Sequence, residues 1–287
     1  MGDLVSRYWL YKYAADNFED CIDFFIPDET GENKQKLIDM FKDSADAIKL
    51  LEKTDEQESN PVNQKISKYE FLQDMRTNLE RIKNDDFKKY LQKRLVERIE
   101  ENRKEDDKLR HYRDWFLICL DIIATYQNRV IEKLLKPTLK TESSEPVVPS
   151  PWYFKNEKRI KTFLSYAYED KGLSLCLFLY FFKNGGFLYV DWMWNGRISD
   201  PDVLKENIRK NLDNSEQLLF LRSARSEFSK SHNLMIKPWC AWEIGNYYDI
   251  HPNKKYIISF YKSSSIHPII EKFKPMLKVR SGRIISK

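Results

Sequence analysis

The strongest constraint on the fold is an alternation of short apolar runs with helix-forming segments after residue 157. The apolar runs have the length and composition of buried strands. They cover residues 159–166, 187–191, 217–221 and 255–260. Helix-forming segments lie between them, at 171–183, from Asp200 onward and from Pro238 onward. Strands that alternate with helices predict an α/β fold, in which helices cover both faces of a parallel sheet.

The first half of the chain has the composition of helices. Residues 4–25, 34–51 and 64–135 contain no proline, and in the last segment apolar residues recur at three- and four-residue steps. We predict an all-α helical bundle over residues 1–136, in which residues 71–107 form a protruding antiparallel hairpin. No residues in this half are arranged for catalysis. We therefore expect it to sense a signal, to oligomerise or to bind a partner.

A segment without periodicity separates the two halves. Residues 137–157 are rich in Glu, Ser and Thr and contain Pro137, Pro146, Pro149 and Pro151. Such a composition predicts an extended, semi-rigid linker. The second domain then covers residues 158–287.

The formal net charge of +5 is unevenly distributed. Residues 1–140 contain 26 Lys+Arg and 29 Asp+Glu, which leaves 23 and 15 for residues 141–287. The basic residues of the second half are scattered and form no long run. This pattern suits an anionic small molecule such as a dinucleotide at least as well as a nucleic acid, and we do not expect a nucleic-acid partner.

The cysteines and the apolar runs indicate the compartment. The four cysteines are far apart, and the four histidines form no cluster with them. This pattern predicts buried thiols in a reducing compartment, without a disulfide framework or a metal site. The longest apolar runs, 115–120 and 175–182, are too short to cross a bilayer. We expect a cytoplasmic protein that has no membrane partner.

The segment that begins at Pro238 places an aromatic ring and an acid on one face of a helix. Proline suits the first turn, and Trp239 and Glu243 are one turn apart. A ring beside a carboxylate could stack a planar heterocycle while the carboxylate meets a sugar. An acid near a helix start more often only complements the helix dipole.

Polar side chains also stand at the ends of the predicted strands. Ligands of open parallel sheets bind beside the carboxyl ends of the strands. Those ends carry Ser165, Tyr166, Asp191 and Ser223, and the helix of Glu243 begins beside them. By themselves these residues fit ordinary strand ends, a turn cap and packing positions better than they fit a binding site.

Five short pieces in this order resemble the Toll/interleukin-1 receptor (TIR) domain. They are Phe163-Leu164-Ser165-Tyr166, Val190-Asp191, a loop with Gly196, the run 219–223 and Trp239-Cys240-Ala241-Trp242-Glu243. The resemblance covers residues 158–261. It implies a flavodoxin-like fold for the second domain.

The resemblance also implies an activity and a site. Many enzymatic TIR domains cleave NAD at the bond between nicotinamide and ribose, and the catalytic glutamate of the family ends a Trp-x-x-x-Glu pattern. Glu243 matches that glutamate. NAD is then the substrate, and neither a cofactor nor a metal is needed. The residues expected to contact NAD are Ser165, Tyr166, Asp191, Trp239 and Arg197, of which Arg197 is a loop cation that could meet the pyrophosphate.

The chain departs from the family pattern at two points. The loop 192–197 is unusually aromatic, which bears on loop-mediated assembly, and the segment after Phe260 looks too short for a full last strand and helix. We expect an NAD glycohydrolase of intracellular immunity, in prokaryotic antiviral defence. Its activity would depend on self-association through both domains and on a protein or nucleotide activator. The alternatives are a synthase that makes a cyclic or conjugated signal from NAD and a TIR scaffold without enzymatic activity.

Overall fold

The structure is a computed structural model. It describes residues 7–18, 31–51, 65–101, 110–135, 159–195, 200–230, 233–250, 253–260 and 266–286. The predicted linker, residues 137–157, lies outside the described residues.

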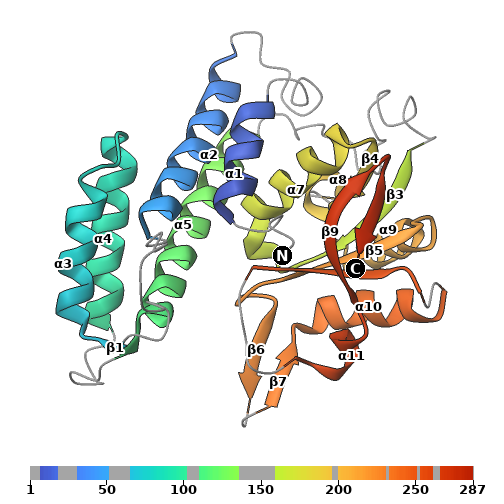
Figure 1. Ribbon diagram of the computed structural model, residues 1–287. Coiled ribbons are helices and arrows are strands. Elements are labelled where there is room, and N and C mark those ends of the chain that lie inside the picture. The colour runs from blue at the N-terminus through green and yellow to red at the C-terminus, as the bar shows by residue number, and fades with distance from the viewer. Residues whose placement is uncertain are drawn as a thin grey trace.

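A six-stranded sheet forms the centre of the second half of the chain (Figure 1). The strand order is β10-β9-β8-β5-β3-β4, and every neighbouring pair is parallel except β9 and β10. In chain order the five parallel strands are arranged 2-1-3-4-5, which is compatible with a flavodoxin-like fold. The predicted α/β class with a parallel sheet is therefore confirmed. The strands are β3 (Ile160–Ser165), β4 (Gly186–Tyr189), β5 (Gln217–Arg222), β8 (Lys255–Ser259), β9 (Lys274–Arg280) and β10 (Arg283–Ser286).

Helices follow the parallel strands as the sequence predicts. The helix α7 (Lys171–Lys183) is apolar nearly all round because it lies between the sheet and the N-terminal helices, and its residues up to Phe181 are all buried. The helices α9 (Pro201–Asp213) and α10 (Pro238–Ile250) contact each other on the other side of the sheet (Figure 1). The shorter helices are η3 (Tyr168–Asp170), α8 (Asp191–Asn195) and α11 (Pro268–Glu271).

The described part of the first half is mainly helical. Its helices are α1 (Arg7–Asn17), α2 (Glu32–Leu51), α3 (Lys68–Leu79), α4 (Asp85–Glu101) and α5 (Tyr112–Leu135). Two short strands, β1 (Lys65–Ile66) and β2 (Arg110–His111), pair antiparallel. The helix α3 begins at a capping box, in which the Ser67 hydroxyl and the Glu70 carboxylate each accept a backbone N–H.

The helices α3 and α4 do not stand free as a protruding hairpin. They contact each other, and they also contact α2 and α5 respectively, at the outer side of the molecule (Figure 1). The two halves of the chain are also in contact, because α1 and α5 pack against α7. Across this contact the Asn128 amide of α5 donates to the backbone carbonyl of Glu169 at 2.6 Å. The helices of the first half therefore rest directly on the α/β part.

The segment after Phe260 contains a last parallel strand, contrary to the expectation that it was too short for one. β9 adds to the sheet edge, and β10 turns back along it. The hairpin turn is tied to the start of β5, where the Gln217 side chain donates to the carbonyl of Gly282 at 3.1 Å. A charged, proline-containing strand concealed this element in the sequence. The only helix in the described part of this segment is the four-residue α11.

A second hairpin also was not predicted. β6 (Glu227–Lys230) and β7 (Asn233–Ile236) pair antiparallel and project from the body below the sheet (Figure 1). Along the chain the hairpin lies between β5 and α10, and it leads directly into the start of the helix that carries Glu243.

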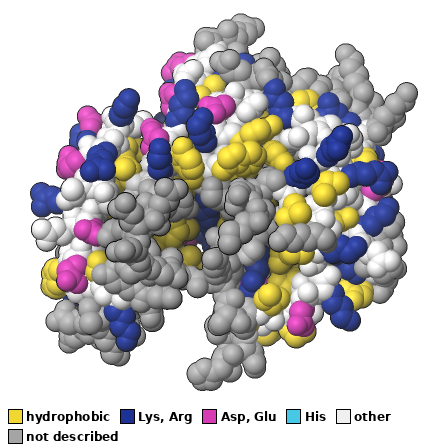
Figure 2. Space-filling model, viewed as in Figure 1, with side chains coloured by type: hydrophobic (Ala, Val, Ile, Leu, Met, Phe, Trp, Pro, Cys, Tyr) yellow, Lys and Arg dark blue, Asp and Glu magenta, His cyan; other side chains and the backbone are white. Residues whose placement is uncertain are grey.

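The surface retains the uneven charge of the sequence. On the face shown in Figure 2, acidic side chains gather mainly over the N-terminal helices, while Lys and Arg are scattered over the α/β part. None of the described helices combines the length and the apolar composition that a membrane-spanning segment requires.

Candidate functional site

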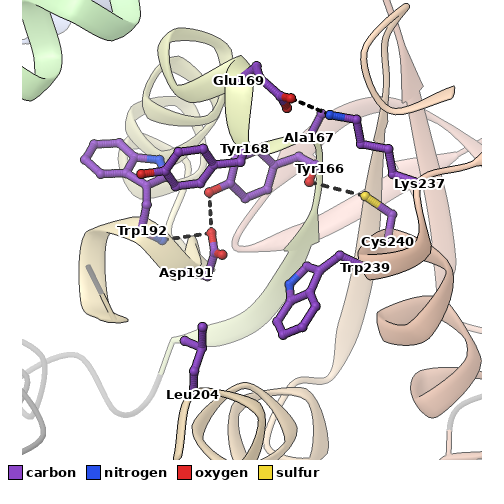
Figure 3. Close-up of a pocket in the computed structure, with 10 residues that line it drawn as sticks. All are labelled: Tyr166, Ala167, Tyr168, Glu169, Asp191, Trp192, Leu204, Lys237, Trp239 and Cys240. Atoms are coloured by element: carbon purple, nitrogen blue, oxygen red, sulfur yellow. Dashed lines mark hydrogen bonds and ion pairs between the residues drawn. The ribbon is translucent and has the colours of Figure 1, made fainter. Parts of the chain in front are cut away.

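The carboxyl ends of β3 and β4 and the start of α10 enclose a pocket of about 460 Å³. Figure 3 shows Tyr166, Asp191 and Trp239 directed toward the same space from these three elements. The order 2-1-3-4-5 reverses between β3 and β5, and the pocket lies at the carboxyl end of β3 beside this switch point. The lining residues are Tyr166, Ala167, Tyr168, Glu169, Asp191, Trp192, Leu204, Lys237, Trp239 and Cys240.

Asp191 is held in place by two donors. The hydroxyl of Tyr166 donates to its carboxylate. The backbone N–H of Trp192 donates to the same oxygen at 2.8 Å. The Trp192 indole in turn donates to Ser174 at 2.9 Å, which fixes this wall of the pocket on α7.

Glu243 lies one helical turn behind Trp239 and does not line the pocket. Its side chain is buried, with 3% of the residue exposed. The hydroxyl of Ser165, which is also buried, donates to its carboxylate at 2.6 Å. The predicted catalytic acid is therefore close to the pocket but closed off from it.

Burial sets the electrostatics of both acids. It raises the pKa of Glu243 well above its usual value, and the negative charge of Asp191 adds to the effect, while bonds from Ser165 and Trp239 oppose it. Burial also raises the pKa of Asp191, against the hydrogen bond from Tyr166. Both carboxyl groups thus lie in a region of low polarity, where the charge of Asp191 disfavours ionisation of Glu243.

An ion pair lines the mouth of the pocket. The Lys237 ammonium lies against the Glu169 carboxylate, and both side chains are partly exposed. Burial raises the pKa of Glu169, but Lys237 and the nearby charge of Arg225 outweigh it and lower the pKa below its usual value. Beneath the mouth, the thiol of Cys240 donates to the backbone carbonyl of Tyr166 at 3.3 Å. These contacts join α10 to the end of β3.

The structure brings together most of the residues that the sequence singled out. Tyr166, Asp191 and Trp239 line the pocket, and Ser165 and Glu243 form a buried pair directly behind it. Ser223, by contrast, turns away and donates to Asp170 at 2.5 Å. The predicted pyrophosphate contact, Arg197, lies outside the described residues.

Sequence reasoning missed the charged groups of the mouth. Glu169 follows the first strand by four residues and Lys237 directly precedes the proline of α10, so both positions were visible at strand and helix ends. What could not be seen is that the two side chains pair, since they are 68 residues apart in the chain.

The described residues include no group of three or more His, Cys, Asp and Glu side chains that could hold a metal ion. Comparisons with protein-family models, curated proteins and solved structures found no match to this chain.

Proposed function

We propose that this chain is a TIR-type NAD glycohydrolase, which cleaves the bond between nicotinamide and ribose in the pocket lined by Tyr166, Asp191 and Trp239. The observation that carries the proposal is the geometry of the pocket, in which the Asp191 carboxyl lies with the rings of Tyr166 and Trp239. The buried carboxyl of Glu243 stands one helical turn behind Trp239. A flat cation that stacks on Trp239 beside Asp191 would favour the ionised form of the Asp191 carboxyl. The oxidised nicotinamide ring of NAD is such a cation.

The aromatic walls suit the leaving group. Tyr166 and Trp239 line the pocket on two sides, and a planar ring can stack on either of them. Nicotinamide leaves as a neutral base, so the reaction needs no general acid at the leaving group. The pocket volume of about 460 Å³ is in the range of small-molecule sites.

Glu243 would stabilise the positive charge that develops at the anomeric carbon of the ribose. In the resting structure its carboxylate accepts from Ser165, and Trp239 stands in front of it. The proposal therefore requires that the Trp239 ring moves aside when NAD enters and that a ribose hydroxyl takes the place of Ser165. A carboxylate in such a water-poor site is worth far more than one in water.

The acceptor decides the product, and the same site serves each acceptor. Water gives ADP-ribose, whereas an adenine nitrogen gives a cyclic isomer and another acceptor gives a conjugate. A role in prokaryotic antiviral defence, with self-association and an activator that acts through the helical half, rests on the family resemblance alone. A TIR scaffold without activity is the remaining alternative.

The test is NAD turnover by the full chain over a range of protein concentrations, with products separated by chromatography. Glu243→Gln keeps the shape of the side chain and removes its charge, so we expect nicotinamide release to fall by about 100-fold or more. Glu271→Gln is the matched control, because Glu271 is an exposed acid on α11. We expect it to behave as the unmodified protein does.

NAD binding is measured in parallel through the fluorescence of the pocket tryptophans, which NAD should quench. Equal turnover in Glu243→Gln and the unmodified chain would refute the catalytic role. Neither turnover nor quenching at millimolar NAD would refute the proposal as a whole and favour the scaffold.

A further inference from the structure

The helix α5 carries a polar face directed at the α/β part. Asp121, Thr125, Asn128 and Glu132 are spaced by four, three and four residues, which places them on one side of the helix. Each of these side chains bonds to a residue of the second half. A helix of the first half thus touches the α/β part through a row of polar contacts as well as through its apolar side.

Arg225 makes the densest of these contacts. It lies in the turn after β5, and its guanidinium donates to the Asp121 carboxylate at 2.8 and 2.5 Å and to the Asp121 carbonyl at 2.9 Å. It also donates to Thr125 at 3.2 Å and to the backbone carbonyl of Glu169 at 2.6 Å. With 16% of its side chain exposed, Arg225 is largely shielded from competing water.

The other contacts converge on the same short segment, residues 168–171, which we call the rim segment. The Asn128 amide donates to the carbonyl of Glu169 at 2.6 Å, so this carbonyl accepts from two side chains. The Lys171 ammonium pairs with Glu132 at 2.7 Å, and the Lys171 side chain is 4% exposed. The rim segment is therefore fastened to α5 at Glu169 and at Lys171.

The rim segment is also part of the pocket. Tyr168 and Glu169 line it, and the Glu169 carboxylate holds Lys237 at the mouth. The Lys171 ammonium lies 3.9 Å from the centre of the Tyr168 ring. A continuous path of contacts thus runs from α5 through the rim segment to Lys237, which stands two residues before Trp239.

We propose that α5 holds the rim of the pocket in its resting arrangement, and that Arg225 is the positioning residue through which a displacement of the helical half loosens this rim. When Arg225 and Asn128 release the Glu169 carbonyl, the rim segment loosens and Glu169 leaves Lys237. The start of α10 then loses its tie to the rim. Through this mechanism the helical half regulates the proposed NAD site. The inference rests on the proposed function only for the identity of the ligand.

Cys240 offers a readout that requires no substrate. Its thiol lines the pocket, 1% of the residue is exposed, and burial raises its pKa, so it should react slowly with iodoacetamide in the resting state. Cys119 in α5 and Cys176 in α7 are also buried but lie outside the pocket lining. They serve as internal references for general loosening of the fold.

The experiment compares alkylation rates in the full chain, cysteine by cysteine, by peptide mass spectrometry. We expect Arg225→Ala to raise the rate at Cys240 by about tenfold, as the loss of bonds to a charged group implies, with Cys176 unchanged. Asp121→Asn should give a smaller rise, because the carbonyl of residue 121 still accepts. Arg225→Lys should restore part of the protection, and Arg209→Ala, which removes an exposed arginine of α9, should have no effect.

An unchanged rate at Cys240 in Arg225→Ala would overturn the proposal. A parallel rise at Cys119, Cys176 and Cys240 would also overturn it, since the contact would then stabilise the whole fold. Nicotinamide release is measured on the same samples. A selective rise at Cys240 supports the coupling even if no NAD is consumed, in which case only the proposed activity fails.

Discussion

Gly172, the second residue of α7, tests how closely the helical half sits on the α/β part. A Cβ atom at this position would lie 2.3 Å from Oε1 and 2.8 Å from Cδ of Gln127 in α5. Gln127 is fully buried and cannot simply swing into solvent. It accepts from the Tyr11 hydroxyl at 3.0 Å and donates to Ser44 at 2.9 Å. Gly172→Ala must therefore displace a side chain that links three helices of the first half.

The cost follows from these contacts. Gln127 would have to retreat by about 1 Å to reach an ordinary contact distance, which strains or breaks two hydrogen bonds worth about 1 kcal/mol each. Overpacking adds about 1–3 kcal/mol if the helices cannot separate. The higher helix propensity of alanine offsets less than about 1 kcal/mol of this loss, because residue 172 is in the first turn of α7. We expect a net loss of about 2 kcal/mol in the free energy of unfolding.

Urea unfolding followed by circular dichroism measures this loss. The control is a double-mutant cycle with Gln127→Ala, which destabilises the protein by itself because Tyr11 and Ser44 lose their partner. In that background the Gly172→Ala change should cost at least about 1 kcal/mol less than in the unmodified chain. A neutral or stabilising Gly172→Ala, or additive effects in the cycle, would refute the close approach of α5 to α7.

Three other substitutions have defined outcomes. Burial and the charge of Asp39 raise the pKa of Asp43 to about 6, so its ionisation destabilises the folded state as the pH rises from about 4 to 6. Asp43→Asn should therefore add about 1 kcal/mol at pH 7, after allowance for its partial exposure, and nothing at pH 4, as measured by urea unfolding at the two pH values. The Arg222 Nε–H donates to both carboxylate oxygens of Glu227 at 2.9 Å, and this ion pair is buried. Glu227→Gln leaves the Arg222 charge without its partner and should lower the free energy of unfolding by about 3 kcal/mol in the same assay at pH 7. Gly282 has a φ of +78°, and a Cβ atom there would lie 2.9 Å from the carbonyl oxygen of Gly185. Gly282→Ala should therefore lower the free energy of unfolding by about 2 kcal/mol and speed amide exchange in β10.

Each of these outcomes can fail in a recognisable way. An Asp43→Asn gain that is equal at pH 4 and pH 7 would show that proton binding is not its cause. A Glu227→Gln protein as stable as the unmodified chain would contradict the burial of the ion pair. Unchanged exchange in β10 of Gly282→Ala would mean that the turn is not held against the sheet.

Local sequence signals located most of the candidate site because its residues stand at the ends of regular elements. A strand end supplied Ser165 and Tyr166, and the proline start of α10 supplied Trp239 and Glu243. These signals depend on neighbours in the chain, so one sequence is enough to read them. They could not show that the Glu243 carboxylate is turned toward Ser165 and away from the pocket, because depth in a pocket depends on packing from other elements.

The sequence by itself determined the alternation of strands and helices, and with it the parallel sheet, since hydrophobic periodicity and caps act over a few residues. The tertiary structure decided what surrounds the site. Arg225 reaches Asp121 across 104 residues, and Lys237 reaches Glu169 across 68. The sequence did not reveal the β9–β10 hairpin either. Its charged strand β9 is stabilised by pairing with β8, and its turn is held by the bond from Gln217. Such contacts leave no periodic signal, and only the packing of the folded chain brings their partners together.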